Sequence, residues 1–312
     1  MQHIFIIDPF DGLKPNHDSS LALMKAALLQ NHSVWQAELA DINLLDNSLI
    51  ISTKLVCLQN NKLIVSGESK KFNLSLKSDF SQILIWMRKD PPVDEKYIRA
   101  CQLLRLSVFP VINNPNSLLS CDEKLLALEF PELIPKTNIS QSLNTIKNLV
   151  LEKGILIAKP IGGKAGEGIL ALKAEDKNLS SLIELLTERE TRSIIVQEYL
   201  PKAPEGDKRI FLLAGEPIGA LLRIPRKDDY RANMAAGGSI AKTNLTAKDL
   251  EICQKLKPRL LELGLNLVGL DIIEEKLTEI NITSPTCLEE ISELNNCDLA
   301  KQIIIWSENL FV

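Results

Sequence analysis

The sequence LVGLDIIEEKLTEIN, residues 267–281, predicts a β-hairpin that carries oxygen-bearing side chains among apolar neighbours. Asp271 lies inside the first apolar run, where burial of an unpaired carboxylate would be costly. Glu279 and Asn281 are two residues apart on the returning strand, so their side chains leave the same face of the sheet. If the connecting loop has an odd number of residues, such as 274–276, Asp271 lies opposite Glu279.

These three side chains would then meet on one face of the hairpin. Mg²⁺ is usually held by one or two carboxylates together with waters and substrate phosphates, and the set Asp271, Glu279 and Asn281 suits it. A strand with a solvated acidic face is the plain alternative. The residues that flank the acidic ones are apolar on both faces of the strands, which favours the metal site over a solvated acidic face.

A glycine-rich segment, KPIGGKAGEG at 159–168, lies between two predicted strands. Its glycines permit positive φ and close approach of backbone N–H groups to an anion, and Lys159 adds charge. The spacing of Gly163, Gly166 and Gly168 fits neither a P-loop nor a GxGxxG dinucleotide motif. An ordinary glycine-rich hairpin loop fits the segment equally well, but a distant metal site makes a nucleotide between two lobes the stronger reading.

Several basic residues have no acidic partner nearby in the sequence. They are expected at strand ends or beside proline turns: Arg88, Lys89, Lys208, Arg209, Arg223 and Arg231. Any one of them alone would usually be solvated surface, whereas a set of guanidinium forks can address carboxylate or phosphate oxygens. With Mg²⁺, such a set fits phosphoryl transfer to a carboxylate, which depends on positioning and charge neutralisation.

The composition excludes several other classes of protein. The 312 residues carry 36 basic and 40 acidic side chains, a formal net charge of −4, and 45% of them are hydrophobic. This length predicts two or three globular domains, and the mildly acidic balance gives no sign of nucleic-acid binding. The three histidines, His3, His17 and His32, lie in the first tenth of the chain. A Ser-His-Asp triad, a zinc hydrolase or a histidine base in the remaining residues is therefore excluded.

The cysteines and apolar segments predict a soluble, cytoplasmic protein. Six cysteines are too sparse for a disulfide framework and form no CxxC motif, so we expect reduced thiols. The N-terminal segment MQHIFIIDPF lacks the basic region of a signal peptide. No apolar run approaches the ~20 residues needed to span a bilayer.

The pattern of apolar runs predicts two kinds of architecture. Residues 1–115 alternate short buried strands with helices, as in an α/β domain with a mostly parallel sheet. Later residues mix strands and helices without strict alternation, which indicates an α+β arrangement. The sequence SCDE at 120–123 is a capping box and predicts a helix that carries Lys124. Thr246 is the predicted N-cap of a helix that ends near Leu263.

With these residues in view, the chain resembles the bacterial-type glutathione synthetases of the ATP-grasp superfamily. The motifs run in the family's order over about two thirds of the chain: MRKDPP (87–92), NNPNSL and CDEKL (113–125), KP (159–160), QEYLP (197–201), GDKR (206–209), RIP (223–225), NMAAGG (233–238), VGLDII (268–273) and TEINITSPT (278–286). The N-terminal segment matches more thinly, mainly through Asp8-Pro9 and 18–20.

The resemblance implies a mostly parallel N-terminal domain followed by a two-lobed ATP-grasp fold. The expected segments are an N-terminal α/β substrate-side domain (1–119), an ATP-grasp small lobe (120–200) and a C-terminal lobe with the metal site (201–312). The implied reaction joins γ-glutamylcysteine to glycine with ATP and forms glutathione, ADP and phosphate through an acyl phosphate. The resemblance also implies a homo-oligomer, a tetramer, while the composition and apolar runs predict a cytoplasmic protein with no nucleic-acid or membrane partner.

The family's functional residues map onto matching positions of this sequence. Phosphate contacts are expected from Lys124, Lys159, Gly163 and Gly166, and nucleoside contacts from Gln197, Tyr199, Leu200 and Asp207. Mg²⁺, or Mn²⁺, would be held by Asp271, Glu279 and Asn281. Arg88 and Ser284 would contact the dipeptide, and Arg209 and Arg223 would stabilise charge on the acyl phosphate and the tetrahedral oxygen. The stretch 226–239 would form a lid that excludes water.

The sequence departs from the family at two places. The glycine-rich loop has Ala165, Glu167 and Gly168 where a Gly-Gly pair and small neutral residues are expected, and Ser239-Ile240 follow the AAGG motif. Two alternatives to a glutathione synthetase follow: an ATP-grasp carboxylate–amine ligase with a different amino-acid acceptor, and a catalytically silent nucleotide-binding paralogue. The intact metal-site residues argue against the silent paralogue.

Overall fold

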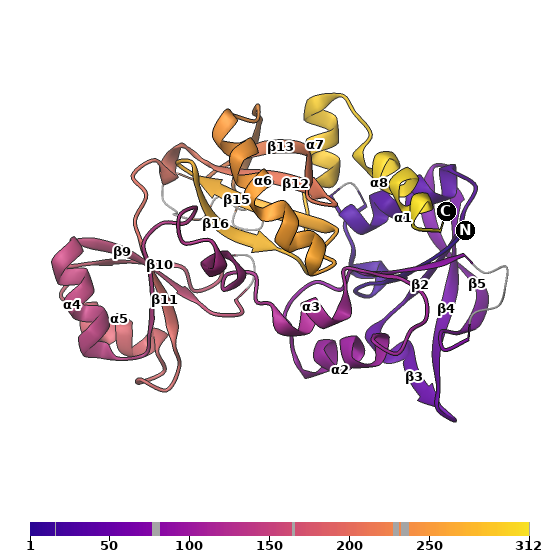
Figure 1. The fold of residues 1–312 in the computed structure, drawn as a ribbon, viewed down its shortest axis with the longest axis horizontal. Coiled ribbons are helices and arrows are strands. Elements are labelled where there is room, and N and C mark those ends of the chain that lie inside the picture. The colour runs from indigo at the N-terminus through magenta and orange to yellow at the C-terminus, as the bar shows by residue number, and fades with distance from the viewer. Residues whose placement is uncertain (16, 77–81, 164–165, 227–230, 232–236, 312) are drawn as a thin grey trace.

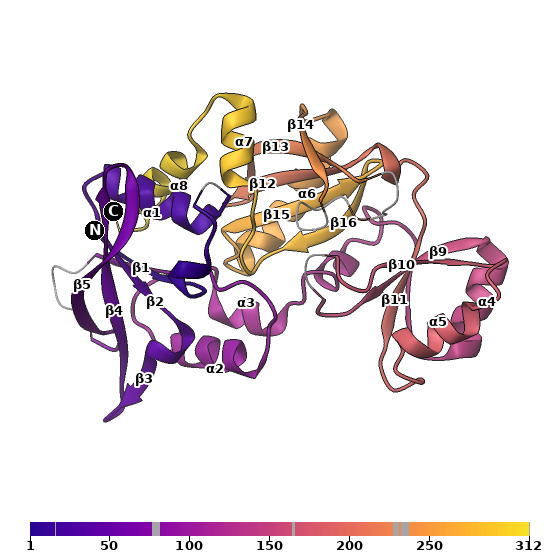
Figure 2. The same cartoon turned by 180° about the vertical axis from the view of Figure 1, so that it is seen from behind.

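The computed structural model describes residues 1–15, 17–76, 82–163, 166–226, 231 and 237–311. Their strands form three sheets that succeed one another along the chain, within residues 2–112, 137–198 and 207–281. Figure 1 shows the first and second sheets at opposite ends of the molecule and the third between them, and Figure 2 shows the same order from behind. The predicted combination of α/β and α+β architecture is confirmed.

The first sheet has a parallel core, as predicted. It contains strands β1 (Gln2–Ile6), β2 (Ser33–Ala37), β6 (Ile83–Met87) and β7 (Val111–Ile112), with β1 central and paired in parallel with β2 and β6. An antiparallel extension follows beyond β2, formed by β3 (Ile42–Leu45), β4 (Ser48–Gln59) and β5 (Lys62–Asn73). In the sequence, Gln59-Asn60-Asn61 between two apolar runs indicate the hairpin of β4 and β5, whereas β3 was not predicted.

Helices cover both faces of this sheet because buried apolar residues of its central strand, Ile4, Phe5 and Ile6, point to both sides. Ile4 and Ile6 face the core that includes helix α2 (Glu95–Leu104), whereas Phe5 faces the core that includes helix α1 (Ser19–Leu29). Asp18 and Asp94 begin these helices, each accepting hydrogen bonds from backbone N–H groups of the first turn.

The second sheet is antiparallel and has helices on one side. Its strand order is β10 (Leu170–Lys173), β9 (Ile155–Pro160), β11 (Ile194–Glu198) and β8 (Thr137–Ser140). Helices α4 (Leu143–Lys153) and α5 (Leu179–Leu186) share a separate apolar core with it, which includes Ile146, Ile183 and Val196. Strand β8 was not foreseen, since its residues are largely polar.

The third sheet is also antiparallel and has the order β14 (Ser239–Lys242), β13 (Glu216–Ile224), β12 (Asp207–Leu213), β15 (Leu267–Ile273) and β16 (Lys276–Asn281). Helix α6 (Ala247–Glu262) packs on one face, and Thr246 begins it with a capping box, as predicted. Helices α7 (Leu288–Asn295) and α8 (Leu299–Glu308) follow. Helix α8 packs against α1, so the end of the chain returns to the first sheet (Figure 1).

Short elements complete the described structure. Helix α3 (Pro115–Ser120) follows the first sheet, and the 3₁₀ helices are η1 (Phe10–Gly12), η2 (Leu39–Asp41), η3 (Leu126–Glu129), η4 (Ala203–Glu205) and η6 (Asn309–Phe311). In the part of the chain that the structure describes, no helix is long and apolar enough to cross a bilayer.

The predicted helix that begins at Ser120 and carries Lys124 is wrong. Helix α3 ends at Ser120, and Lys124 lies in a turn whose backbone is held by Asp122 Oδ1. The Glu123 carboxylate does not fold back to cap a helix, because it accepts hydrogen bonds from Ile282 N, Thr283 N and Thr283 Oγ1 at 2.7–2.9 Å. Glu123 therefore makes a tertiary contact and does not serve as the acidic residue of a capping box.

The hairpin of β15 and β16 has a shorter loop than expected. Only Glu274 and Glu275 connect the strands, both with positive φ, so the predicted three-residue loop is wrong. A register shift between Asp271 and Ile272 restores the missing residue, and Asp271 still pairs with Glu279. The predicted opposition of these two carboxylates is therefore confirmed, although by a bulge and not by the loop.

Candidate active site

A cavity of about 680 Å³ lies where residues of all three sheets and their connecting loops meet, within the usual range for a small-molecule site. Of the fifteen side chains predicted to act in catalysis or binding, thirteen line it: Gly163, Gly166, Lys159, Gln197, Tyr199, Leu200, Asp207, Arg209, Arg223, Asp271, Glu279, Asn281 and Ser284. Lys124 and Arg88 are not part of its wall. The fold therefore brings together residues that are up to 125 positions apart in the sequence, from Lys159 to Ser284.

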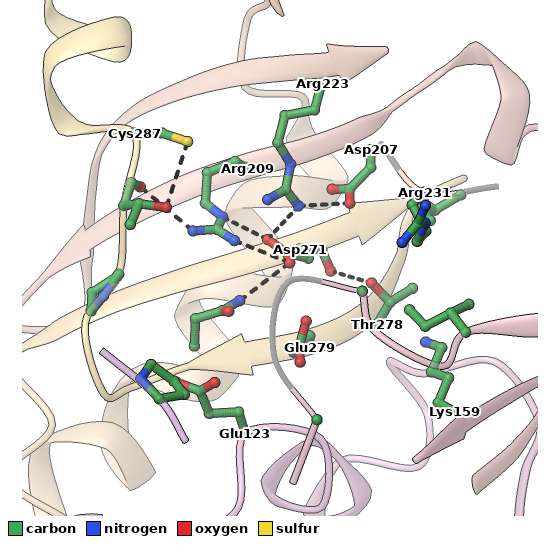
Figure 3. Close-up of a pocket in the computed structure, with 18 of the residues that line it drawn as sticks. Glu123, Lys159, Asp207, Arg209, Arg223, Arg231, Asp271, Thr278, Glu279 and Cys287 are labelled. Carbon is green, nitrogen blue, oxygen red and sulfur yellow. Dashed lines mark hydrogen bonds and ion pairs between the residues drawn. The ribbon is translucent and has the colours of Figure 1, made fainter. Parts of the chain in front are cut away.

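Asp271 lies at the centre of a buried ionic cluster (Figure 3). Arg209 stands directly opposite it on β12 and binds both carboxylate oxygens, with Nε–Oδ1 at 2.6 Å and Nη2–Oδ2 at 3.2 Å. Arg223 places its Nη2 2.9 Å from Asp271 Oδ1. Each of the three side chains is less than 8% exposed, so these charges depend on one another.

Arg223 also binds a second carboxylate. Asp207 is its partner across β12 and β13, and its Oδ2 lies 2.6 Å from Arg223 Nη2. Both ion pairs of Arg223 use this one nitrogen, and its buried Nε has no hydrogen-bond partner. The buried Oδ1 of Asp207 is likewise unpaired. Arg223 thus keeps one buried donor, Nε, that the described residues do not satisfy.

Two neighbouring carboxyls of the cluster have opposite electrostatic surroundings. Burial alone would raise the pKa of Asp271. The charges of Arg209 and Arg223 have the larger, opposite effect and hold this pKa well below its usual range. Burial raises the pKa of Glu279 to about 7, and Asp271 and Glu123 push in the same direction against Lys124. Burial of Glu279 therefore outweighs the attraction of the nearby Lys124 and Lys159.

The three predicted metal ligands meet on one side of the hairpin. Asn281 Nδ2 donates to Asp271 Oδ2 and to Gly269 O, both at 3.2 Å, which leaves its Oδ1 for a cation. A divalent cation beside Glu279 would offset the burial that raises its pKa. The residues present fit an oxygen-ligated metal, although Asp271 is here engaged by two arginines. Among the described residues, no group of three His, Cys, Asp or Glu side chains forms a metal site without the amide.

Lys124 and Lys159 approach the same region from different elements. Lys124 Nζ donates to Gly163 O at 2.6 Å and lies 3.3 Å from Glu279 Oε1. Lys159, at the end of β9, donates to Gln197 Oε1 at 2.8 Å, and burial lowers its pKa. Lys164 and Ala165 of the glycine-rich loop lie outside the described residues. Lys159, Gly163 and Gly166 therefore line one end of the cavity, and Lys124 lies behind it against Gly163.

The adjoining end of the cavity is more apolar. Ile157, Ile169, Tyr199 and Leu200 line it, which suits the flat face of a base. Gln197 is fixed there because its amide also donates to Thr137 Oγ1 at 2.9 Å. These surroundings agree with a nucleoside beside the predicted phosphate contacts.

Two predicted features are placed differently. Arg88 is 3% exposed and lies behind the cavity wall, where it donates to Pro285 O and Ser20 Oγ; its contact with a dipeptide stays a prediction. Of the predicted lid at 226–239, residues 227–230 and 232–236 lie outside the described structure. Arg231 lines the cavity.

Comparisons with known proteins agree with this arrangement. The family models "Prokaryotic glutathione synthetase, N-terminal domain" and "Prokaryotic glutathione synthetase, ATP-grasp domain" match residues 1–118 and 123–296. The chain belongs to the prokaryotic glutathione synthetase family. Glutathione synthetases of Gloeobacter violaceus and Thermosynechococcus vestitus are similar to it, with 44% and 43% identity over 98% of this chain and 96% and 99% of theirs. The resemblance seen in the sequence is confirmed.

Solved structures place the chain in the ATP-grasp fold. D-cycloserine synthetase DcsG and the macrocyclase MdnC from Microcystis aeruginosa, solved with the precursor peptide MdnA, both align with a TM-score of 0.67. They share 12% and 14% identity with this chain over 98–99% of its length and 99–100% of theirs. At this identity the likeness concerns the fold alone, and it confirms the predicted fold class.

Some residues of this family member line the site without having been singled out in the sequence. Glu123, whose three hydrogen bonds fix the end of β16, lies next to Lys124, and its main-chain oxygen accepts from Ile280 N. His17 and Glu290, 273 positions apart, form a pair in the cavity wall at 3.0 Å. The CDEKL motif contained Glu123, but no local signal distinguished Glu290 from a charge on a helix surface.

Proposed function

We propose that the protein is an ATP-dependent ligase that joins γ-glutamylcysteine to glycine and forms glutathione, ADP and phosphate. The observation that carries the proposal is one cavity in which two arginines, three oxygen-bearing hairpin side chains and a lysine at a glycine-rich loop converge. The glutathione synthetases similar to this chain cover nearly all of its length, which supports the same reaction here.

In the proposed reaction the cysteinyl carboxylate of the dipeptide attacks the γ-phosphorus of ATP, and ADP leaves. The amine of glycine then attacks the carbonyl carbon of the acyl phosphate, and phosphate departs with one of the original carboxylate oxygens. Arg209 and the unpaired edge of Arg223 would stabilise the negative oxygens in both steps. Lys124 and Lys159 would hold phosphate oxygens, and Gln197, Tyr199 and Leu200 would surround the adenine.

A divalent metal is part of this proposal, and the donors favour Mg²⁺ or Mn²⁺. An ATP-grasp ligase with 16% identity and a TM-score of 0.61, PsnB, has been solved with Mg and ADP. Here Asp271, Glu279 and Asn281 would hold the metal, which when bound neutralises phosphate charge. The segments 1–119, 120–200 and 201–312, the dipeptide contacts of Arg88 and Ser284, a homotetramer and a cytoplasmic location also remain proposals.

The acceptor amine decides between this activity and that of another carboxylate–amine ligase. Purified protein with ATP, Mg²⁺ and γ-glutamylcysteine is supplied with glycine or with one of a panel of amino acids, and the products are identified by mass. We expect glycine-dependent ADP release with glutathione as the product. A preference for another amine would reassign the substrate, and the lack of amine-dependent ADP release would indicate a silent nucleotide-binding protein.

A further inference from the structure

The cavity continues beyond Arg209 to a second end, between loops of the first sheet and the start of α7. Lys14, His17, Asp90, Ser284 and Glu290 line this end, which we call the seam end. The segment 285–287 joins it to the ionic cluster, since Arg209 Nη1 donates to Thr286 O at 3.5 Å. A ligand that reaches both Arg209 and the seam end must carry functional groups at two separated positions.

Glu290 is the most informative residue of the seam end. It is 4% exposed on the first turn of α7, and its Oε1 pairs with His17 Nδ1 at 3.0 Å. Its other oxygen, Oε2, is buried without a hydrogen-bond partner. Leaving a buried carboxylate oxygen unpaired is unfavourable, so this position favours a hydrogen-bond donor that the chain itself does not supply.

A second carboxylate strengthens the negative character of the seam end. Asp90 lines the cavity beside Ser284, whose hydroxyl hydrogen-bonds to it, and the backbone N–H of Asp90 is held by Asp8 Oδ2 at 3.0 Å. The nearby guanidinium of Arg88 is turned to Pro285 O behind the wall. Lys14 is exposed and, in the described structure, forms no ion pair with either carboxylate. The two carboxylates therefore suit a small cation such as an ammonium group.

We propose that Glu290, oriented by His17, and Asp90 bind the α-ammonium of the γ-glutamyl residue of the dipeptide. The inference rests on the proposed function and deepens it. The dipeptide has its reacting carboxylate at the cysteinyl end and its amino-acid head group at the other. If Arg209 and Arg223 hold the reacting end, the head group extends toward the seam end, and Lys14 is placed to meet its α-carboxylate. The seam end would thus select γ-glutamyl compounds from other cysteine amides.

Substrate analogues isolate this contact. N-Glutaryl-L-cysteine equals γ-glutamylcysteine without the α-amino group, and 4-aminobutyryl-L-cysteine keeps the amine but lacks the α-carboxylate. Wild type should use the glutaryl compound with a kcat/KM about 10- to 100-fold lower than for γ-glutamylcysteine, as expected for loss of a charged hydrogen bond. In Glu290→Gln this difference in kcat/KM should shrink at least several-fold, with Asp90 still present, whereas the dependence on the α-carboxylate should remain.

Two controls separate recognition from damage to the fold. Glu289→Gln changes the neighbouring carboxylate on α7, which does not line the cavity, and should keep the wild-type ratio. Because both substrates are compared within one variant, partial unfolding cancels. His17 is 59% exposed, so His17→Phe should fold. In this variant the preference for γ-glutamylcysteine over the glutaryl compound should be partly lost. His17→Asn, which keeps a hydrogen-bond donor, should restore that preference.

The result that would overturn the inference is an unchanged ratio in Glu290→Gln, or an effect confined to the KM for glycine. Either result would mean that the seam end does not bind the α-ammonium group of the γ-glutamyl residue. Failure of the proposed function would look different, because wild type would then form no glutathione from γ-glutamylcysteine and glycine.

Discussion

Arg209 and Asp271 face each other across β12 and β15, and their side chains form a buried ion pair at 2.6 Å. The carboxylate expected to bind a metal is thus balanced by a guanidinium expected to act on the substrate, and Arg223 shares it. If Asp271 binds a metal and the arginines bind the substrate, as proposed, these contacts must change when the ligands bind. We infer that the arginines stabilise Asp271 as a carboxylate before ligands arrive and turn to phosphate oxygens afterwards.

Arg223→Lys should reduce kcat more than it weakens ATP binding. A lysine keeps the charge but presents no second donor edge, and the unpaired Nε of Arg223 is the edge available to the reacting group. We expect kcat to fall about 10²-fold and the KM for ATP to change less than about threefold. Steady-state ADP release measures both, with Arg259→Lys as a control outside the cavity. A change confined to the KM for ATP would remove Arg223 from the transition-state role.

Glu279→Gln should abolish turnover while the fold persists. The change keeps the size of the side chain but removes one of two carboxylates proposed to hold the metal, so we expect ADP release to fall about 10²-fold or more. The matched control is Glu275→Gln in the exposed loop of the same hairpin. Activity would be titrated with Mg²⁺ and folding followed by thermal unfolding. Near-normal activity at saturating Mg²⁺ would contradict the ligand assignment.

Glu123 should act as a positioning residue through hydrogen bonds rather than charge. Its Oε1 accepts three hydrogen bonds from the end of β16, and the turn that it fixes carries Lys124. Glu123→Ala should lower kcat/KM for ATP about 10-fold or more, while Glu123→Gln, which retains an acceptor oxygen, should recover most of it. Equal losses in the two variants would show that the negative charge itself is required.

The pH dependence of stability should report on His3. Burial lowers the pKa of His3 to about 3, and its ring accepts from Trp86 Nε1 and pairs with His32 at 2.9 Å. Because the folded pKa lies below the unfolded value of 6.5, the stabilisation is full above pH 6.5 and is lost as pH falls toward 3. Between pH 7.5 and 5.5 the free energy of unfolding should fall by ~1.4 kcal/mol from this group.

Urea unfolding of wild type and His3→Asn at these two pH values measures that difference. Asparagine keeps an acceptor for Trp86 but does not titrate, so its stability should change less between the two conditions. If the free energy of unfolding changed equally with pH in both proteins, titratable groups other than His3 would be responsible for the change.

Much of the fold was predictable because its signals are local. Continuous apolar runs indicated the buried parallel strands β1 and β6, and side-chain alternation placed Glu279 and Asn281 on one face. The contacts between distant segments gave no such signal. Asn113, for example, donates to Leu267 O and Ile282 O, both at 2.7 Å, and accepts from Leu267 N, which joins the end of the first sheet to both strands of the hairpin. Periodicity in one segment does not reveal a partner 154 positions away.

The candidate site shows the same division. The residue types and spacing of the hairpin predicted the convergence of Asp271 and Glu279, whereas the bulge that produces it depends on the backbone geometry of a two-residue loop. The helix expected at Lys124 was wrong because Glu123 binds the end of β16 instead of capping. His17 was counted only as one of three N-terminal histidines, yet the return of α7 to α1 brings Glu290 against it.

The path of an oxygen atom tests the central claim most directly. γ-Glutamylcysteine labelled with ¹⁸O in its cysteinyl carboxylate is incubated with ATP, Mg²⁺ and glycine, and the released phosphate is analysed by mass spectrometry. If the carboxylate is phosphorylated and then attacked by the amine, each phosphate carries one ¹⁸O and appears with one glutathione. Unlabelled phosphate would show that ATP is hydrolysed by water, and would contradict the acyl phosphate on which the roles of Arg209 and Arg223 depend.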